Sequence, residues 1–151
     1  MEMKEVKIKK LNEKAVIPTY GSTSAAGADL YAVVNNNTNM VEILPHETAF
    51  IGTGIAMEIP ENYVGLIYAR SGMACKKGLA PANKVGVIDS DYRGEIIVAL
   101  YNQSNEVRTI ETGDRIAQII IQPVKQSNFV LVNEVSDTSR GDGGFGSTGK
   151  A

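Results

Sequence analysis

The sequence has little of what supports metal or thiol chemistry. Its 151 residues include one cysteine, Cys75, and one histidine, His46. A single cysteine allows no intrachain disulfide, which suits a reducing compartment. Because the two residues lie far apart in the sequence, a His/Cys zinc site and a Cys–His nucleophile pair both have little support.

Long apolar runs and an excess of positive charge are also missing. The first ten residues, MEMKEVKIKK, lack the apolar segment of a signal peptide. No stretch approaches the roughly 18 apolar residues of a membrane-spanning helix. The net charge of −2 argues against a broad basic surface for nucleic acid or anionic lipid. We therefore expect a cytoplasmic protein with no membrane and no nucleic-acid partner.

What is present is a single domain of ordinary size, built from short strands separated by turn residues. Repeated strands at this spacing predict an all-β sandwich or closed barrel. One short helix is expected at Ser71–Lys77, with Ser71 as its N-cap. From about residue 137 the apolar periodicity stops, so we expect a body over residues 1–136 and a separate glycine-rich segment over 137–151. The expected strands are Glu5–Lys10, Ala28–Val34, Val41–Leu44, Thr48–Ile59, Tyr63–Tyr68, Val85–Ile88, Glu95–Asn102, Arg108–Glu111, Arg115–Pro123 and Phe129–Val135.

Two of these strands are too apolar for a sheet with one wet face. The stretches "RIAQIIIQPV" and "GEIIVALYN" run almost without polar alternation, as strands buried on both faces do. A small all-β protein with such strands often buries one face against copies of itself, so we expect a homo-oligomer.

The stretch "VGVIDSDYRGEIIV" has the pattern of a β-hairpin whose five-residue loop ends at Gly94. Asp89 lies at the end of the first arm, where a carboxylate could orient a water and accept its proton. The alternative is that Asp89 and Asp91 are ordinary turn residues that bond the local backbone.

Four further polar residues stand in apolar or helix-start surroundings. Arg70 and Ser71 precede the expected helix and could bind an anion, or they could be a solvated arginine and a cap. Asp29, in "AAGADLYA", could reach a hydrated metal or pair with an arginine. Gln118, within "RIAQIII", needs a partner from the backbone, a subunit neighbour or a ligand.

The chain ends in "RGDGGFGSTGKA", which superficially resembles a phosphate-binding P-loop. The resemblance fails because no Ser or Thr follows Lys150 and no helix can follow. Glycine-rich ends usually fray, yet flexible tails rarely need Phe145. An aromatic ring beside Arg140, Ser147 and Thr148 offers a stacking surface and phosphate donors. Both the tail and the nucleotide-binding interpretation stay open on composition alone.

Five stretches together are more specific than any one of them. In order, "AGADLYA", "ARSGMA", "GVIDSDYRG", "GDRIAQ" and "RGDGGFGSTG" resemble the five motifs of the trimeric deoxyuridine triphosphatases, or dUTPases. The resemblance spans Ala25 to Lys150, with Met73 and Ala69 as small departures. It implies a jelly-roll-type β-sandwich of the β-clip kind, assembled as a homotrimer with active sites at subunit interfaces. The implied reaction is Mg²⁺-assisted hydrolysis of dUTP to dUMP and pyrophosphate, which lowers dUTP and supplies dUMP for thymidylate synthesis.

The resemblance also implies roles at the base, the sugar and the attacked phosphorus. Asp89 would activate the water that attacks the α-phosphorus in line. Tyr92 would lie under the deoxyribose and leave no room for a 2′-hydroxyl. Asn83 and the backbone around Val87 and Ile97 would read the edge of uracil.

The phosphate groups would be held by Arg70, Ser71, Gly72 and Gln118. Magnesium would ride on the phosphates, with Asp29 reached through water and no direct protein ligand.

The C-terminal motif would form a mobile arm that closes over the nucleotide. Phe145 would stack on uracil, Arg140, Ser147 and Thr148 would contact the γ-phosphate, and Gly146 would let the backbone come close.

Two rival functions remain. A dCTP deaminase on the same fold needs a glutamate in the second arm of the hairpin, where this sequence has Ala99. A nucleotide-sensing protein without catalysis is the other, although every catalytic-type residue is present.

Overall fold

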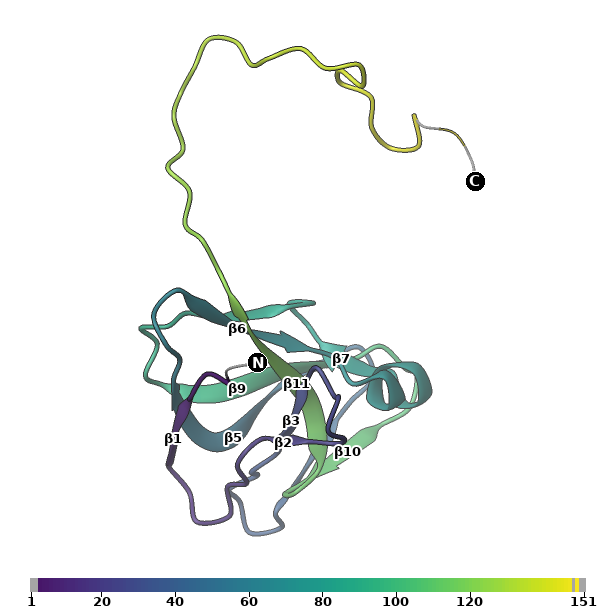
Figure 1. The fold of residues 1–151 in the computed structure, drawn as a ribbon. Helices are drawn as coiled ribbons and strands as arrows, with labels where there is room; N and C mark the ends of the chain where they lie inside the picture. Colours follow the sequence, from purple (N-terminus) through teal and green to yellow (C-terminus); the bar gives the residue numbers. More distant parts are fainter. Residues whose placement is uncertain (1–2, 148, 150–151) are drawn as a thin grey trace.

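The computed structural model describes residues 3–147 and residue 149 (Figure 1). It is built from antiparallel strands and one short helix, which confirms the all-β class. The elements in chain order are β1 (Lys7–Lys10), β2 (Thr19–Tyr20), β3 (Ala28–Tyr31), β4 (Met40–Ile43), β5 (Thr48–Glu58), β6 (Tyr63–Tyr68), η1 (Met73–Lys77), β7 (Leu79–Pro81), β8 (Gly86–Ile88), β9 (Glu95–Asn102), β10 (Arg108–Glu111) and β11 (Arg115–Pro123).

Two main sheets enclose the core. One has the order β1-β5-β9-β7 and the other the order β2-β3-β11-β6-β8, while β10 and β4 form a small third sheet. Alternation in β9 points Ile96, Val98 and Leu100 inward, where they are fully buried. They join Leu30 of β3 and Ile119 of β11 in one hydrophobic cluster. Side chains from both sheets therefore share one core.

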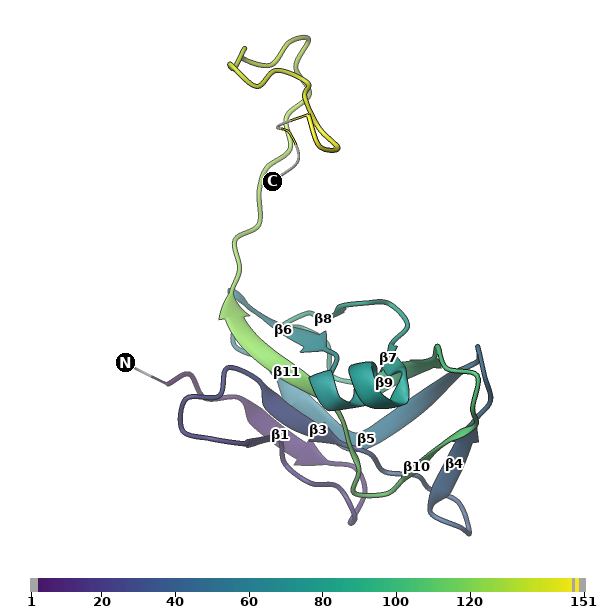
Figure 2. The same ribbon diagram turned by 90° about the vertical axis from the view of Figure 1, so that its right-hand side faces the viewer.

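The expected strand Phe129–Val135 is wrong. β11 ends at Pro123, and the chain then runs away from the body as irregular backbone in two perpendicular views (Figures 1 and 2). Phe129 is 94% exposed and Leu131 is 98% exposed. A strand needs a neighbour for its ladder of hydrogen bonds, and none of the described strands pairs with this segment. Two short strands, β2 and β7, went unpredicted because each spans only two or three residues.

The short helix is present, but Ser71 does not cap it. Gly72 occupies the N-cap position with helical dihedral angles, and no side chain bonds the first turn. The helix is a π-helix that ends at Gly78, whose φ of 70° suits glycine. Among the described residues, no helix is long and apolar enough to span a bilayer.

The expected hairpin of β8 and β9 is also wrong. β8 pairs with β6 in the five-stranded sheet, whereas β9 pairs with β5 and β7 in the four-stranded sheet. The loop Ser90–Gly94 therefore crosses between the two sheets instead of turning within one of them. Local sequence gives the two arms and the turn but does not tell which strand each arm pairs with.

Candidate active site

A polar cavity of about 270 Å³ opens where β3, β11 and the end of β6 meet. The ladder sets Gln118 opposite Asp29 on one side and opposite Tyr68 on the other. The chain then leaves β6 and brings Arg70 and Ser71 to the same edge. The lining residues are Gly21, Ala25, Gly27, Asp29, Arg70, Ser71, Gly72, Arg115 and Gln118.

Two arginines share one carboxylate in this cavity. Asp29 Oδ1 accepts from Arg70 Nε at 2.8 Å, and Oδ2 lies 3.4 Å from Arg115 Nη1. The Asp29 side chain is only 13% exposed, so both contacts are partly shielded from water. One negative charge against two positive charges leaves the cavity with a net positive charge, which suits a phosphate chain.

Gln118 finds its partner in the backbone. Its Nε2 donates to the carbonyl oxygen of Ala69 at 2.9 Å, which ties β11 to the segment that carries Arg70. Gly27 leaves space for this side chain, since a Cβ there would collide with Gln118 Oε1 and lie 3.1 Å from Cδ. Within the chain, the Gln118 amide nitrogen thus has a backbone partner.

Arg115 is a cavity residue that sequence reasoning missed. It stands in the quoted stretch "GDRIAQ", two residues after Gly113, and both its guanidinium and its backbone serve the cavity. Its carbonyl oxygen accepts from Arg70 Nη1 at 3.3 Å. The available signal was its position at the start of the strand that carries Gln118.

Asp89 begins an exposed turn at the other end of β6. Tyr92 N–H donates to the Asp89 carbonyl oxygen at 3.1 Å, and Arg93 Nη1 donates to the Ser90 carbonyl oxygen at 2.7 Å. These bonds use backbone oxygens, and the Asp89 side chain is exposed. The turn interpretation of Asp89 therefore holds for its backbone, while its carboxylate faces solvent.

Of the three residues expected to read a base, Val87 and Ile97 lie on β8 and β9, and Asn83 lies in the turn between β7 and β8. Asn83 is exposed, Val87 of β8 is 61% exposed and Ile97 of β9 is 46% exposed. Ala99 O accepts from Ala82 N–H on the β7 side of β9. Since backbone groups alternate along a strand, those of Ile97 point to the same side, beyond the last residue that β7 pairs.

A single chain does not bring Asp89 to the cavity. Asp89 follows Ile88, which pairs with Gly65, so it lies at the level of Val64. The cavity carboxylate Asp29 lies three strands across and level with Tyr68. With strands ~4.8 Å apart and ~3.3 Å per residue, the backbones at Asp29 and Asp89 are ~20 Å apart.

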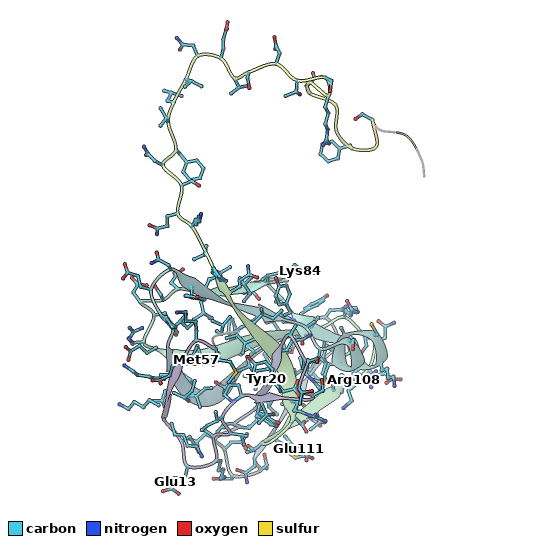
Figure 3. The ribbon with its side chains drawn as sticks, in the orientation of Figure 1. Glu13, Tyr20, Met57, Lys84, Arg108 and Glu111 are labelled. Atoms are coloured by element: carbon cyan, nitrogen blue, oxygen red, sulfur yellow. The ribbon has the colours of Figure 1, made fainter. Side chains whose placement is uncertain are left out.

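The C-terminal residues that the structure describes bond only to one another. Arg140 Nε donates to the Gly143 carbonyl oxygen at 2.8 Å, and Ser147 N–H donates to the Gly144 carbonyl oxygen at 3.1 Å. Phe145 is fully exposed, and Gly146 has a φ of 88°. Thr148 lies outside the described residues. The side chains along this segment project into open space, away from the body that carries the labelled Tyr20 and Met57 (Figure 3).

Among residues 3–147 and 149, no group of three or more His, Cys, Asp or Glu side chains gathers to hold a metal ion. Asp29 is the single carboxylate among the described residues that line the polar cavity. The donor set of the cavity therefore fits a metal ion that is held mainly by substrate phosphates.

Comparison with known proteins decides the family. The sequence model of the dUTPase family matches residues 13–149. The chain belongs to the dUTPase family. Deoxyuridine 5′-triphosphate nucleotidohydrolase of Nautilia profundicola is 51% identical over 97% of this chain and 99% of the relative. The enzyme of the same name from Hydrogenobaculum sp. is 49% identical over 94% of this chain and 96% of the relative.

Solved structures of dUTPases share the fold. A mutant dUTPase of Staphylococcus bacteriophage 80alpha with dUpNHpp superposes with a TM-score of 0.85 at 30% identity, covering 98% of this chain and all of that one. A mutant dUTPase of phage phi11 of S. aureus, described with a structural Mg(II) ion, has a TM-score of 0.74 at 27% identity over 87% of this chain and 98% of that one.

Proposed function

We propose that this dUTPase hydrolyses dUTP to dUMP and pyrophosphate, with water attacking the α-phosphorus. The observation that carries the proposal is the positively charged cavity of Asp29, Arg70, Arg115 and Gln118, beside a family match over nearly the whole chain. The reaction lowers dUTP and supplies dUMP for nucleotide metabolism.

Asp89 orients the attacking water and accepts its proton. An exposed carboxylate at the start of a turn suits this role, because it is not consumed by a structural bond within the described residues. Arg70, Ser71 and Gln118 hold the phosphates. Gly72 lets the backbone approach, since the space where a Cβ would stand is open apart from its own neighbours along the chain. Phosphoryl transfer needs positioning and charge neutralisation more than covalent help.

Mg²⁺ would neutralise the charge that develops on the phosphate chain when it is bound with the substrate. Asp29 would reach the ion through water, because both of its oxygens already contact arginines. The Arg70 and Arg115 guanidinium groups supply positive charge on their own, next to the same phosphates.

Base and sugar are read at the edges of β8 and β9. Backbone groups around Val87 and Ile97 imitate a pairing partner for uracil, with Asn83 beside them. A pocket of fixed donors and acceptors rejects cytosine because donors would then face donors. Tyr92 lies under the deoxyribose and excludes a 2′-hydroxyl.

A complete site needs more than one chain. A general base acts on a group within hydrogen-bond distance or through one bridging water. The ~20 Å between Asp89 and the cavity within one chain is too long for either. We infer a jelly-roll-type homotrimer in which Asp89 of one subunit meets the cavity of another. The exposed apolar segment Phe129–Val135 supports assembly with further copies. So does a largely apolar groove of about 690 Å³ whose lining includes Ile17, Tyr20 and Ile121.

Residues 137–151 then act as a mobile arm over a body of residues 1–136. Phe145 stacks on uracil, while Arg140, Ser147 and Thr148 contact the γ-phosphate. Gly146 already has the positive φ that lets the backbone wrap closely around a ligand. A segment that orders on binding also excludes water from the reaction.

The reaction is tested by hydrolysing dUTP with Mg²⁺ in water enriched in heavy oxygen. We expect the label in dUMP and none in pyrophosphate, since the water joins the α-phosphorus. Label in pyrophosphate would show that water attacks the β-phosphorus instead. Deamination is tested in the same assay with dCTP. We expect no uracil nucleotide, because Ala99 on β9 offers no side chain for acid or base catalysis.

A further inference from the structure

The hydroxyl end of the Tyr92 ring occupies the space where a Cβ of Gly94 would stand. A Cβ at Gly94 would lie 2.6 Å from Tyr92 Cζ and 3.0 Å from Cε2, with the hydroxyl oxygen closer still. All three of its nearest atoms belong to Tyr92. Gly94 has no positive φ, so an L side chain is compatible with its backbone. The place of the ring is therefore the observed reason for glycine here.

We call Gly94 and Glu95 together the seat of the Tyr92 ring, because Glu95 also holds the ring in place. Tyr92 Oη donates to the Glu95 carbonyl oxygen at 2.9 Å, which holds the ring down on Gly94. Glu95 is itself fixed from its other end. Its Oε1 accepts from Gly54 N–H at 2.8 Å, where the pairing of β5 with β9 is irregular between Gly52 and Ala56.

The carboxylate of Glu95 also depends on a missing side chain. A Cβ at Gly52 would lie 2.8 Å from Glu95 Oε1. Glu95 thus lies on β9 and Gly94 directly precedes it, whereas Tyr92 lies in an exposed loop and is 43% exposed. A loop side chain gains a fixed position only through such contacts with rigid elements.

The geometry points to Gly94 as a specificity-determining residue for the sugar. Its bare Cα keeps the Tyr92 ring low enough to admit deoxyribose and to block a 2′-hydroxyl. The inference rests on the proposed reading of deoxyribose by Tyr92 and assigns the control of that reading to a residue that contacts no substrate atom itself. Any side chain at position 94 would lift or swing the ring.

The test is Gly94→Ala, because the colliding atoms are the far end of a side chain that can rotate away. We expect the fold to survive, with a melting temperature close to that of the wild type. The ratio of kcat/KM for dUTP to that for UTP should fall by about tenfold or more, since selection by shape against one added group is worth ~10²-fold at most. Selection of dUTP over dTTP, which depends on the strand edges, should stay unchanged.

Two further variants separate the inference from the proposed function. Tyr92→Ala should relax sugar selection by itself, and adding Gly94→Ala to it should change nothing more, because the collision is gone. If Tyr92→Ala relaxes selection and Gly94→Ala does not, the seat is refuted while the role of Tyr92 stands. If neither variant changes the selection of dUTP over UTP, both the inference and the proposed role of Tyr92 are refuted. Loss of dTTP rejection in Gly94→Ala would show general damage to the site and would also overturn the inference.

Discussion

Two inactive variants should restore each other's activity when they are assembled together. The first variant, Asp89→Asn, removes the base that activates water. The second, Arg70→Ala, removes the guanidinium that lies 2.8 Å from Asp29 in the phosphate cavity. The expectation follows from the ~20 Å between Asp89 and Asp29 within one chain, estimated from strand spacing and rise.

The size of the restoration follows from symmetry. In a cyclic trimer, each site takes Asp89 from one subunit and Arg70 from the next one around the ring. Any ring that mixes the two variants then contains a single interface where an intact Asp89 meets an intact Arg70. Mixed trimers should therefore show about one third of the wild-type kcat per trimer, whichever variant is in excess.

The assay is co-expression of the two variants with different affinity tags, followed by purification on both tags. Each variant alone is the control, and size-exclusion chromatography checks that Arg70→Ala still assembles. If it does not, Gln118→Ala takes its place as the cavity variant. Activity of assembled mixed trimers no higher than that of the single variants would refute a site shared between subunits.

Three more changes have defined outcomes. Asp89→Asn alone should lower kcat by about 10²- to 10⁴-fold while calorimetry still shows dUTP binding, and loss of binding would remove the general-base role. Deleting Gly141–Ala151 should cut hydrolysis severely and leave the elution volume of the assembly essentially that of the full chain; unchanged kinetics would contradict the arm. Gly27→Ala should displace Gln118 from the Ala69 carbonyl, because the added Cβ would collide with the Gln118 side chain. We expect KM for dUTP to rise by about tenfold, which corresponds to the loss of one hydrogen bond near charged groups. Rejection of dTTP should be unchanged and serves as the control.

Much of the body could be predicted because its strands are runs of apolar and β-branched residues between turn residues. The bounds of β6, β9, β10 and β11 agree with these runs. Asp29 and its arginine partner were also among the options that the sequence left open. Signals of this kind are local, because they can be read from residues that are neighbours along the chain.

What failed depends on contacts between distant segments. β8 and β9 look like a hairpin from their turn, yet sheet membership is decided by β6 and β5, which are far away in sequence. Phe129–Val135 has the composition of a strand but finds no partner among the described strands. Arg115 enters the cavity only because β11 lies beside β3, which no local pattern reveals.

The central claim is tested most directly by measuring pyrophosphate release with Mg²⁺ from dUTP, dTTP, dCTP and UTP side by side. Turnover of dUTP, with the other three nucleotides nearly inert, is the predicted result and would establish the reaction and the reading of base and sugar together. No turnover of dUTP, with binding retained, would contradict the account and leave a nucleotide-sensing protein as the better description.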